Sequence, residues 1–440
     1  MADALKIGIA GLGTVGSSLV RILGERANEL ARTCGRPITI TAVSARDKSR
    51  DRGVDLSAIQ WFDSAVDMAN SADIDVFVEL MGGAEGAADQ SVRAALSRGL
   101  HVVTANKALL ARCGVELAVM AEDKGALLNY EAAVAGGIPV IKALRESLTG
   151  NTVSRVYGIM NGTCNYILTR MEKEGLSFEA CLKEAQRLGY AEADPTFDIE
   201  GNDTAHKLAI LTTLAFGTQI AADEIYLEGI SNISIEDIQA AADLGYRIKL
   251  LGVALRTDTG IEQRVHPTMV PHDSVIAQVD GVTNAVAIES DILGELLMVG
   301  PGAGGNATAS AVLGDIADIA KSRPGAQRVP VLGNPAASLA PYTRAQMQSH
   351  EGGYFIRLTV LDRAGVFADV ATRMADNGIS LESIVQRAKG SEADSGSKTI
   401  ILVTHATTEQ SIRKAVDAIK SGTYLAGEPQ VIRIERPKAF

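Results

Sequence analysis

Leu5-Lys-Ile-Gly-Ile-Ala-Gly-Leu-Gly-Thr-Val-Gly16 is the stretch that determines the class of fold. An apolar strand over residues 5–10 runs into Gly11, Gly13 and Gly16, and a helix is predicted from residue 15 to about residue 30. In this strand–turn–helix context the glycines allow a tight turn and a close approach of backbone to a pyrophosphate. The helix N-terminus offers N–H groups to the phosphates. We therefore predict a dinucleotide site, with a purely structural glycine turn as the alternative.

Strands and helices alternate from this segment to about residue 130. Further strands are predicted over residues 38–43, 76–80, 101–104 and 126–130, and helices over residues 87–98 and 108–124. This alternation indicates a parallel, doubly wound sheet of the Rossmann type with right-handed crossovers. Ligands bind such sheets at the carboxyl ends of the strands. The residues that follow each strand are therefore candidate site residues.

The end of the second strand bears on the choice of dinucleotide. NAD sites usually carry an acidic residue there, but this chain has Arg46 followed by Lys48 and Arg50. Arg46 is expected to pair with the 2′-phosphate of NADP, although NAD stays possible and a solvated basic turn is the alternative. The cofactor contacts predicted from the strand ends are Gly11, Gly13, Thr14, Val15, Gly16, Arg46, Gly82, Thr104 and Lys107.

The second informative segment is residues 189–207, GYAEADPTFDIEGNDTAHK. Carboxylates crowd ahead of Lys207, and Asp203 shares a helix face with it because the two are four residues apart. The helix continues with an uncharged apolar run, so a lysine entering it needs a partner or a chemical role. An acidic loop and one ammonium group at a buried helix suit a small zwitterionic substrate. An exposed helix ion pair is the alternative.

The remaining chain divides into further domains. An α+β substrate domain is expected over residues 136–325, after a Rossmann domain over residues 1–135, with the helix over residues 308–322 packing back on the latter. A proline-bearing linker over residues 326–350 leads to a flexible entry at Gly352-Gly353. Residues 351–440 show a βαββαβ order and are expected to form a detachable module.

Composition limits the possible partners. The net charge of −11 and the lack of a basic stripe argue against nucleic acid as a partner. No apolar run approaches the about 20 residues that span a bilayer, so no membrane association is expected. The four cysteines show no CxxC spacing and the six histidines no zinc pattern. With no signal peptide, these thiols indicate a cytoplasmic protein.

These motifs together resemble the homoserine dehydrogenases, in the monofunctional form with a C-terminal ACT domain. No kinase segment precedes Met1, so the fused bifunctional form is not expected. The resemblance spans about the first 320 residues and includes the NGTxNYI and DxxxK patterns. The matching segments are residues 11–16, 104–107, 130–139, 158–167, 189–207 and 300–305.

The resemblance implies roles for individual residues. Lys207 corresponds to the lysine that handles the substrate hydroxyl proton, and Lys107 to the second active-site lysine, although a surface lysine is its alternative from spacing alone. The substrate contacts implied are Glu192, Asp198 and Asp203. The turn residues implied to bind sodium or potassium are Glu131, Val134, Gly136 and Ile138, where the spacing alone favours an ordinary turn. The further cofactor contacts implied are Gly189 and Gly304.

The implied reaction is the reversible NAD(P)-dependent reduction of L-aspartate 4-semialdehyde to L-homoserine, with threonine as the implied effector of the ACT domain. ACT domains usually pair edge to edge, so a homodimer or tetramer is expected. Ala364 stands where many ACT turns carry proline, which weakens the expectation of ligand binding. Two alternatives remain: a phosphorylating semialdehyde dehydrogenase with Cys164 as nucleophile, and a non-catalytic amino-acid sensor.

Overall fold

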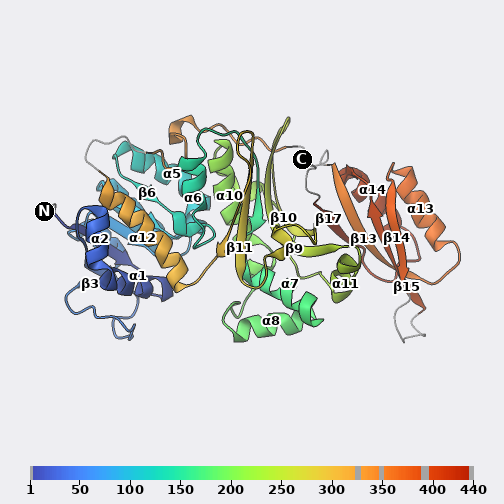
Figure 1. Cartoon of the computed structure of the whole chain (residues 1–440), viewed down its shortest axis with the longest axis horizontal. Coiled ribbons are helices and arrows are strands. Elements are labelled where there is room, and N and C mark those ends of the chain that lie inside the picture. The colour runs from blue at the N-terminus through green and yellow to red at the C-terminus, as the bar shows by residue number, and fades with distance from the viewer. Residues whose placement is uncertain (1–2, 323–328, 346–350, 388–395, 436–440) are drawn as a thin grey trace.

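The computed structural model describes residues 3–322, 329–345, 351–387 and 396–435. Three parts follow one another along the long axis of the molecule: an α/β domain, a central sheet flanked by helices, and a C-terminal α+β domain (Figure 1). No helix in these ranges is long and apolar enough to cross a bilayer.

The N-terminal domain is built on a six-stranded sheet of order β3-β2-β1-β4-β5-β6 in which all neighbours are parallel. Its strands are β1 (Leu5–Ala10), β2 (Ile38–Ser44), β3 (Gln60–Phe62), β4 (Val76–Glu79), β5 (His101–Thr104) and β6 (Leu128–Asn129). Its helices are α1 (Thr14–Glu25), α2 (Ala27–Cys34), α3 (Ala65–Ser71), α4 (Ala87–Ser97) and α5 (Lys107–Asp123). Central strands are mostly apolar because helices cover both faces. The predicted doubly wound parallel sheet is confirmed.

Three local features of this domain differ from the prediction. Strand β3 and helix α3 are short and are absent from the sequence prediction, and β3 lies half-exposed at the sheet edge. The single helix predicted from residue 15 to 30 is divided into α1 and α2, because Arg26 leaves helical geometry with φ −109° and ψ 14°.

Helix α12 (Gly305–Lys321) comes from far along the chain and packs on α1 and α2. Its buried face carries Val312 and Ile316, which join the same apolar cluster as Ile7 and Ile9 of β1. The helix thus covers one face of the N-terminal sheet, as Figure 1 shows.

The central domain contributes five long strands to a mixed sheet. They are β7 (Val153–Ile159), β9 (Tyr246–Thr257), β10 (Gly260–Pro271), β11 (Thr283–Ser290) and β12 (Gly294–Pro301). The helices that pack on them include α7 (Gly162–Glu174), α8 (Phe178–Arg187), α9 (Thr196–Ile199), α10 (Asn202–Phe216) and α11 (Ile235–Asp243). The antiparallel hairpin β9–β10 is its longest pairing. The sequence predicts only residues 264–267 of this hairpin as a strand. Polar residues such as Lys249 interrupt the apolar strand pattern although they are buried.

The C-terminal domain has the predicted βαββαβ order. Its main elements are β13 (Glu351–Leu361), α13 (Val366–Asp376), β14 (Leu381–Arg387), β15 (Ser397–Thr404), α14 (Glu409–Lys420) and β17 (Gln430–Ile434), with a two-residue strand β16 (Thr407–Thr408) before α14. Its apolar core lies between the sheet and the two helices and includes Ile356, Val370, Met374 and Ile419.

The C-terminal domain shares its sheet with the central domain, contrary to the expectation of a detachable module. Strand β17 lies between β13 and β10, with Arg433 beside Thr268 and Ile434 beside Gly353. The sheet therefore runs through eleven strands. Gly352 and Gly353 are strand residues of β13, so the predicted flexible entry at this position is wrong.

The described part of the predicted linker, residues 329–345, packs along both preceding domains. The Tyr130 hydroxyl donates to the Val331 carbonyl over 2.7 Å, and the Gln219 amide to the Ala340 carbonyl over 2.9 Å. The Ala345 amide donates to the Ile261 carbonyl, also over 2.9 Å. This segment is therefore held by backbone hydrogen bonds rather than free in solution.

Candidate active site

A cavity of about 750 Å³ opens where the carboxyl ends of the N-terminal strands face the central domain. The Rossmann side contributes Val15, Ala105 and Lys107 to its wall, and the central domain contributes α7, α10 and the loop after β12. Among the predicted site residues its lining includes Val15, Lys107, Gly136, Gly189, Asp198, Asp203, Lys207 and Gly304. The predicted dinucleotide turn and the predicted substrate residues therefore meet at one place.

Helix α10 places Asp203 and Lys207 on the cavity wall. Gly201 starts the helix in a left-handed conformation with φ 88°, and nearly all later positions are buried, which explains the absence of charge after Lys207. The Lys207 ammonium donates to the Asp203 carboxylate over 2.7 Å and to the Met160 carbonyl over 2.6 Å. Asp203 and Lys207 are 4% and 8% exposed, so the surface ion pair considered as an alternative is excluded.

Lys107 reaches the same carboxylate from the other domain. Asn106 caps α5 by accepting a hydrogen bond from the Leu109 amide, which sets Lys107 at the first turn of that helix. Its ammonium lies 2.9 Å from the second oxygen of Asp203. One carboxylate thus holds two ammonium groups, one from each domain.

Asn161 and Thr163 complete the polar wall and were not assigned a role from the sequence. Asn161 caps α7 and donates to Asp198 over 2.8 Å and to Asp203 over 2.9 Å. The Thr163 hydroxyl donates to the Tyr190 carbonyl over 2.7 Å. The signal for them was present, because Asn161-Gly-Thr163 is the start of the quoted NGTxNYI pattern. Glu192 is exposed, lies outside the cavity lining, and acts on Lys107 only as a nearby negative charge.

The charges of the site shift each other's titration. Burial would raise the pKa of Asp203, but the two lysines outweigh it and hold that pKa well below its usual range. Burial lowers the pKa of Lys207, and the like charge of Lys107 lowers it further against the attraction of Asp203. The pKa of Lys107 is raised, since Asp203 more than offsets the effect of burial. Burial and the neighbouring Asp203 raise the pKa of Asp198. Of the two lysines, Lys207 therefore gives up its proton more readily.

The glycine-rich turn has the close packing that a dinucleotide loop requires. Gly11 has φ 102°, and a Cβ there would lie 2.5 Å from the Leu80 carbonyl. A Cβ on Gly16 would lie 2.1 Å from the Gly11 carbonyl, whereas Gly13 faces open space. These positions, together with Thr14, form the turn at the start of α1, next to the cavity-lining Val15.

The other predicted cofactor residues occupy different surroundings. The buried Thr104 hydroxyl donates to Glu79 over 2.6 Å, and the Gly82 amide donates to the same carboxylate over 3.0 Å. Both residues therefore stabilise the carboxyl ends of β4 and β5 through Glu79. Arg46 is exposed in the loop after β2. Arg52, which was not predicted, donates to the Leu12 carbonyl over 3.2 Å and lies over the Trp61 ring at 5.6 Å. A basic group therefore connects the loop after β2 to the glycine-rich turn.

Asn284 is a further unpredicted residue of the cavity wall. It is 1% exposed, and its side-chain oxygen has no hydrogen-bond partner within the described part of the chain. A Cβ on Gly302 would fall 2.0 Å from the Asn284 side chain, so only glycine leaves room for this amide. The Gly302–Gly305 segment is thus shaped partly by Asn284 and not only by a ligand.

The turn predicted to bind a monovalent cation is strongly bent. Ala135 and Gly136 both adopt left-handed geometry, with φ 54° and 48°. The Glu131 carboxylate accepts the Ile141 and Lys142 amides over 2.8 and 2.9 Å, and burial raises its pKa to about 7. The Ile138 carbonyl accepts the Val140 amide. Backbone carbonyls of this turn, rather than the occupied carboxylate, are the oxygens suited to a hard cation. Among the described residues no cluster of three or more His, Cys, Asp or Glu side chains has the arrangement of a metal site.

A dinucleotide-type turn and two lysines on one buried carboxylate, brought together at the strand ends, define an NAD(P)-dependent oxidoreductase. Family models agree and are more specific: they match homoserine dehydrogenase over residues 139–317, the NAD binding domain of homoserine dehydrogenase over residues 11–131, and an ACT domain over residues 354–421. The chain belongs to the homoserine dehydrogenase family.

Two of the similar proteins cover 98% of the chain. A homoserine dehydrogenase of Pseudomonas aeruginosa is 44% identical over 98% of this chain and 99% of its own length. The crystal structure of a homoserine dehydrogenase from Thiobacillus denitrificans is 42% identical, with a TM-score of 0.92 over 98% of both chains. A hyperthermophilic archaeal homoserine dehydrogenase in complex with NADPH is 28% identical, with a TM-score of 0.61 over 71% of this chain and 96% of its own.

The surroundings of Cys164 predict that it is unreactive. The thiol is fully buried, lies 3.2 Å from the Asp198 carbonyl, and has a pKa raised well above its usual value by burial and the nearby carboxylates. Brief alkylation with iodoacetamide at neutral pH, read by peptide mass spectrometry, should label the half-buried Cys113 and leave Cys164 unmodified. Faster labelling of Cys164 than of Cys113 would support the alternative in which Cys164 is a nucleophile.

Proposed function

We propose that this chain interconverts L-homoserine and L-aspartate 4-semialdehyde with Lys207 as the group that exchanges the hydroxyl proton. The observation that carries the proposal is the Asp203 carboxylate held between the Lys107 and Lys207 ammonium groups at the cavity wall. Bound nicotinamide supplies the hydride acceptor for oxidation and the donor for reduction. Steady-state rates with L-homoserine and each of NAD and NADP test the assignment directly.

The two lysines have different tasks because their surroundings differ. Lys207 is the more deeply buried and has the lowered pKa, so it accepts the hydroxyl proton during oxidation and returns a proton to the aldehyde oxygen during reduction. Lys107 has a raised pKa, stays charged, and fixes Asp203 from the Rossmann side. Asp198, with Glu192 further out, supplies negative charge for the substrate ammonium group.

Replacing Lys207 by methionine should abolish most turnover, because proton transfer typically contributes about 10²–10⁴ to the rate. The methionine side chain fills similar space, so binding of the nicotinamide cofactor should persist. Stopped-flow or steady-state kcat with L-homoserine is the measurement. A variant that keeps kcat within about threefold of the parent would remove Lys207 from the mechanism.

Lys107→Ala provides the matched control for electrostatics. Without this cation the pKa of Lys207 rises. In the pH profile of kcat/KM for homoserine oxidation, the ascending limb should therefore move to higher pH. Lys107→Arg keeps the charge and should leave the limb in place. An unmoved limb in Lys107→Ala would mean that another group titrates.

We infer a preference for NADP over NAD from the composition of the loop after β2. Arg46 is exposed there and no acidic residue ends the strand, while the related archaeal enzyme was solved with NADPH. Arg46→Ala should raise KM for NADP by about tenfold and leave KM for NAD unchanged, since a charge-assisted hydrogen bond is lost. Arg26→Ala, on a distant exposed helix end, is the control. Equal losses for both cofactors would contradict the assignment.

We also propose that the turn at Val134, Gly136 and Ile138 holds sodium or potassium, next to Glu131. Ala135 and Gly136 adopt successive left-handed conformations in this turn, and its backbone carbonyls are oxygen donors of the kind that hard cations prefer. A cation bound at 100 times its Kd adds about 2.7 kcal/mol to the free energy of unfolding. The melting temperature in sodium or potassium chloride should therefore exceed that in tetramethylammonium chloride at equal ionic strength. Identical melting curves in these salts would contradict the proposed cation site.

The remaining proposals concern assembly and regulation. The exposed edge strands β12 and β14 and the exposed Ile292 and Leu293 favour a homodimer or tetramer. The ACT domain supports feedback regulation by threonine, the downstream product, and the four free cysteines accord with a reducing, cytoplasmic setting. Inhibition of the full chain by L-threonine is the direct test of the regulatory part.

A further inference from the structure

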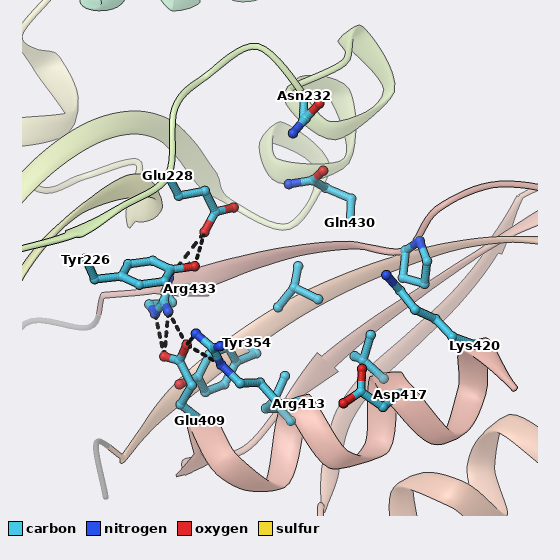
Figure 2. A pocket seen from close by; sticks show the side chains of 14 residues that line it. Tyr226, Glu228, Asn232, Tyr354, Glu409, Arg413, Asp417, Lys420, Gln430 and Arg433 are labelled. Carbon is cyan, nitrogen blue, oxygen red and sulfur yellow. Dashed lines mark hydrogen bonds and ion pairs between the residues drawn. The ribbon is translucent and has the colours of Figure 1, made fainter. Parts of the chain in front are cut away.

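Buried charges recur in the shared sheet, and they fall into groups with different surroundings. Arg433 of β17 donates to Glu409 over 3.0 Å, and Arg413 pairs with the same carboxylate, so this group closes on itself at the junction with the ACT domain (Figure 2). Lys249 and Arg247 of β9 belong to another group, beside α7. This second group differs because Lys249 contacts a backbone segment whose end lines the catalytic cavity.

Lys249 is a buried ammonium group with an acceptor for each of its three N–H donors. It is 1% exposed and donates to the Val279 carbonyl over 2.6 Å, to the Asn165 side-chain oxygen over 3.2 Å and to the Asp280 carboxylate over 3.4 Å. Burial and the like charge of Arg247 lower its pKa to about 8, so the group is protonated at neutral pH. Burying this charge costs free energy, which these contacts offset. The proposed proton transfer does not use it.

The contact with Lys249 fixes the orientation of the Asn165 amide. An ammonium group can only donate, so the oxygen of that amide must face it and the amide nitrogen must face the other way. The nitrogen donates to three alternate carbonyls, those of Val279, Gly281 and Thr283, over 3.0, 2.9 and 3.3 Å. One buried amide therefore holds several carbonyls of a single backbone segment.

Residues 279–284, the wall segment, contact the substrate side of the catalytic cavity. The last three of these residues line the cavity. A Cβ on Gly162 would lie 2.8 Å from the Val282 carbonyl, so the wall segment packs against the first turn of α7. That turn follows Asn161, which donates to both carboxylates of the substrate side. Because packed backbones cannot shift independently, the position of the wall segment affects the position of these carboxylates.

The wall segment also leads to the cofactor side. Asn284 pairs with Gly300 in the β11–β12 ladder, and its side chain fills the space beside Gly302. The loop after β12 ends at Gly305, where a Cβ would lie 2.7 Å from the Ser18 hydroxyl of α1. The glycine-rich turn begins α1, so this loop links the wall segment to the predicted dinucleotide site.

We propose that Lys249 is a positioning residue for hydride transfer, because its ammonium group and the Asn165 amide hold the wall segment against both ligand sites. Hydride transfer requires the substrate carbon and the nicotinamide ring to meet in one geometry, and a misplacement of about 1 Å can cost about 10² in rate. Lys249 does not line the cavity and acts through the wall segment. The inference deepens the proposed function and rests on it for the reaction that is measured.

Lys249→Met tests the proposal, since methionine has a similar length and cannot donate. The kcat for L-homoserine oxidation, expressed per site that binds reduced nicotinamide cofactor, should fall about tenfold, while both KM values stay within about threefold. Counting these sites by fluorescence titration removes the effect of unfolded protein. Asn165→Ala should give the same loss, and it carries the test if Lys249→Met does not fold. The double variant should lose no more than either single variant, because both side chains act through one segment.

Arg247→Met is the matched control. Arg247 lies on the same strand, is 5% exposed, and binds the Glu172 carboxylate and the Ala277 carbonyl. It also pairs with the Asp280 carboxylate, but within the described chain its hydrogen bonds reach no carbonyl of the wall segment. Loss of this buried cation should lower the melting temperature and leave kcat per site within about twofold of the parent.

Hydrogen exchange provides a readout that does not depend on turnover. The amides of residues 279–284 should exchange faster in Lys249→Met than in the parent, because the segment opens more often when its donors are lost. Unchanged exchange, an unchanged kcat per site, or single-variant losses that multiply in the double variant would each overturn the inference. A parent protein without homoserine activity would instead defeat the proposed function, and exchange alone would then decide whether Lys249 holds the wall segment.

Discussion

The carboxylate of Asp203 is the interaction on which the active site depends. It is buried, and a buried charge is tolerated only when it is paired and hydrogen-bonded. Asp203 meets that condition three times, through Lys207 of its own helix, Asn161 of the neighbouring helix, and Lys107 of the Rossmann domain. Lys207 and Asn161 belong to the central domain, and the contact with Lys107 adds to theirs only when the two domains are in their observed positions. Catalytic geometry and domain arrangement are fixed by the same contact.

Sequence patterns gave a reliable account of the elements whose periodicity is regular. The Rossmann sheet, the buried helix from Asn202 to Phe216 and the βαββαβ tail all follow from apolar spacing and glycine positions. The hairpin β9–β10 is largely absent from the prediction because Arg247 and Lys249 are buried in it, satisfied by partners that only the tertiary structure supplies. Local pattern cannot reveal such compensation.

The same division applies to the site. The i,i+4 spacing of Asp203 and Lys207 predicts that they share one helix face. The sequence alone does not predict that Lys107 contacts Asp203 from another domain. Asn161 and Asn284 acquire their importance from position: one bridges two carboxylates, and the other fills the space left by Gly302. Short polar residues of this kind have many structural uses, so residue type by itself does not single them out.

The place of β17 in the shared sheet has a consequence for the order of folding. Strand β10 is synthesised well before β17, which becomes available only after most of the ACT domain has been made. Until then β10 lacks a strand partner at Thr268 and Met269, beyond the part of the same edge that pairs with Tyr226 and Leu227, and unpaired edges of newly made chains are where incorrect association begins. The catalytic domain of this protein therefore completes its sheet late in synthesis, and a nascent chain stalled within the ACT domain would present a nearly finished enzyme with this part of the edge uncovered.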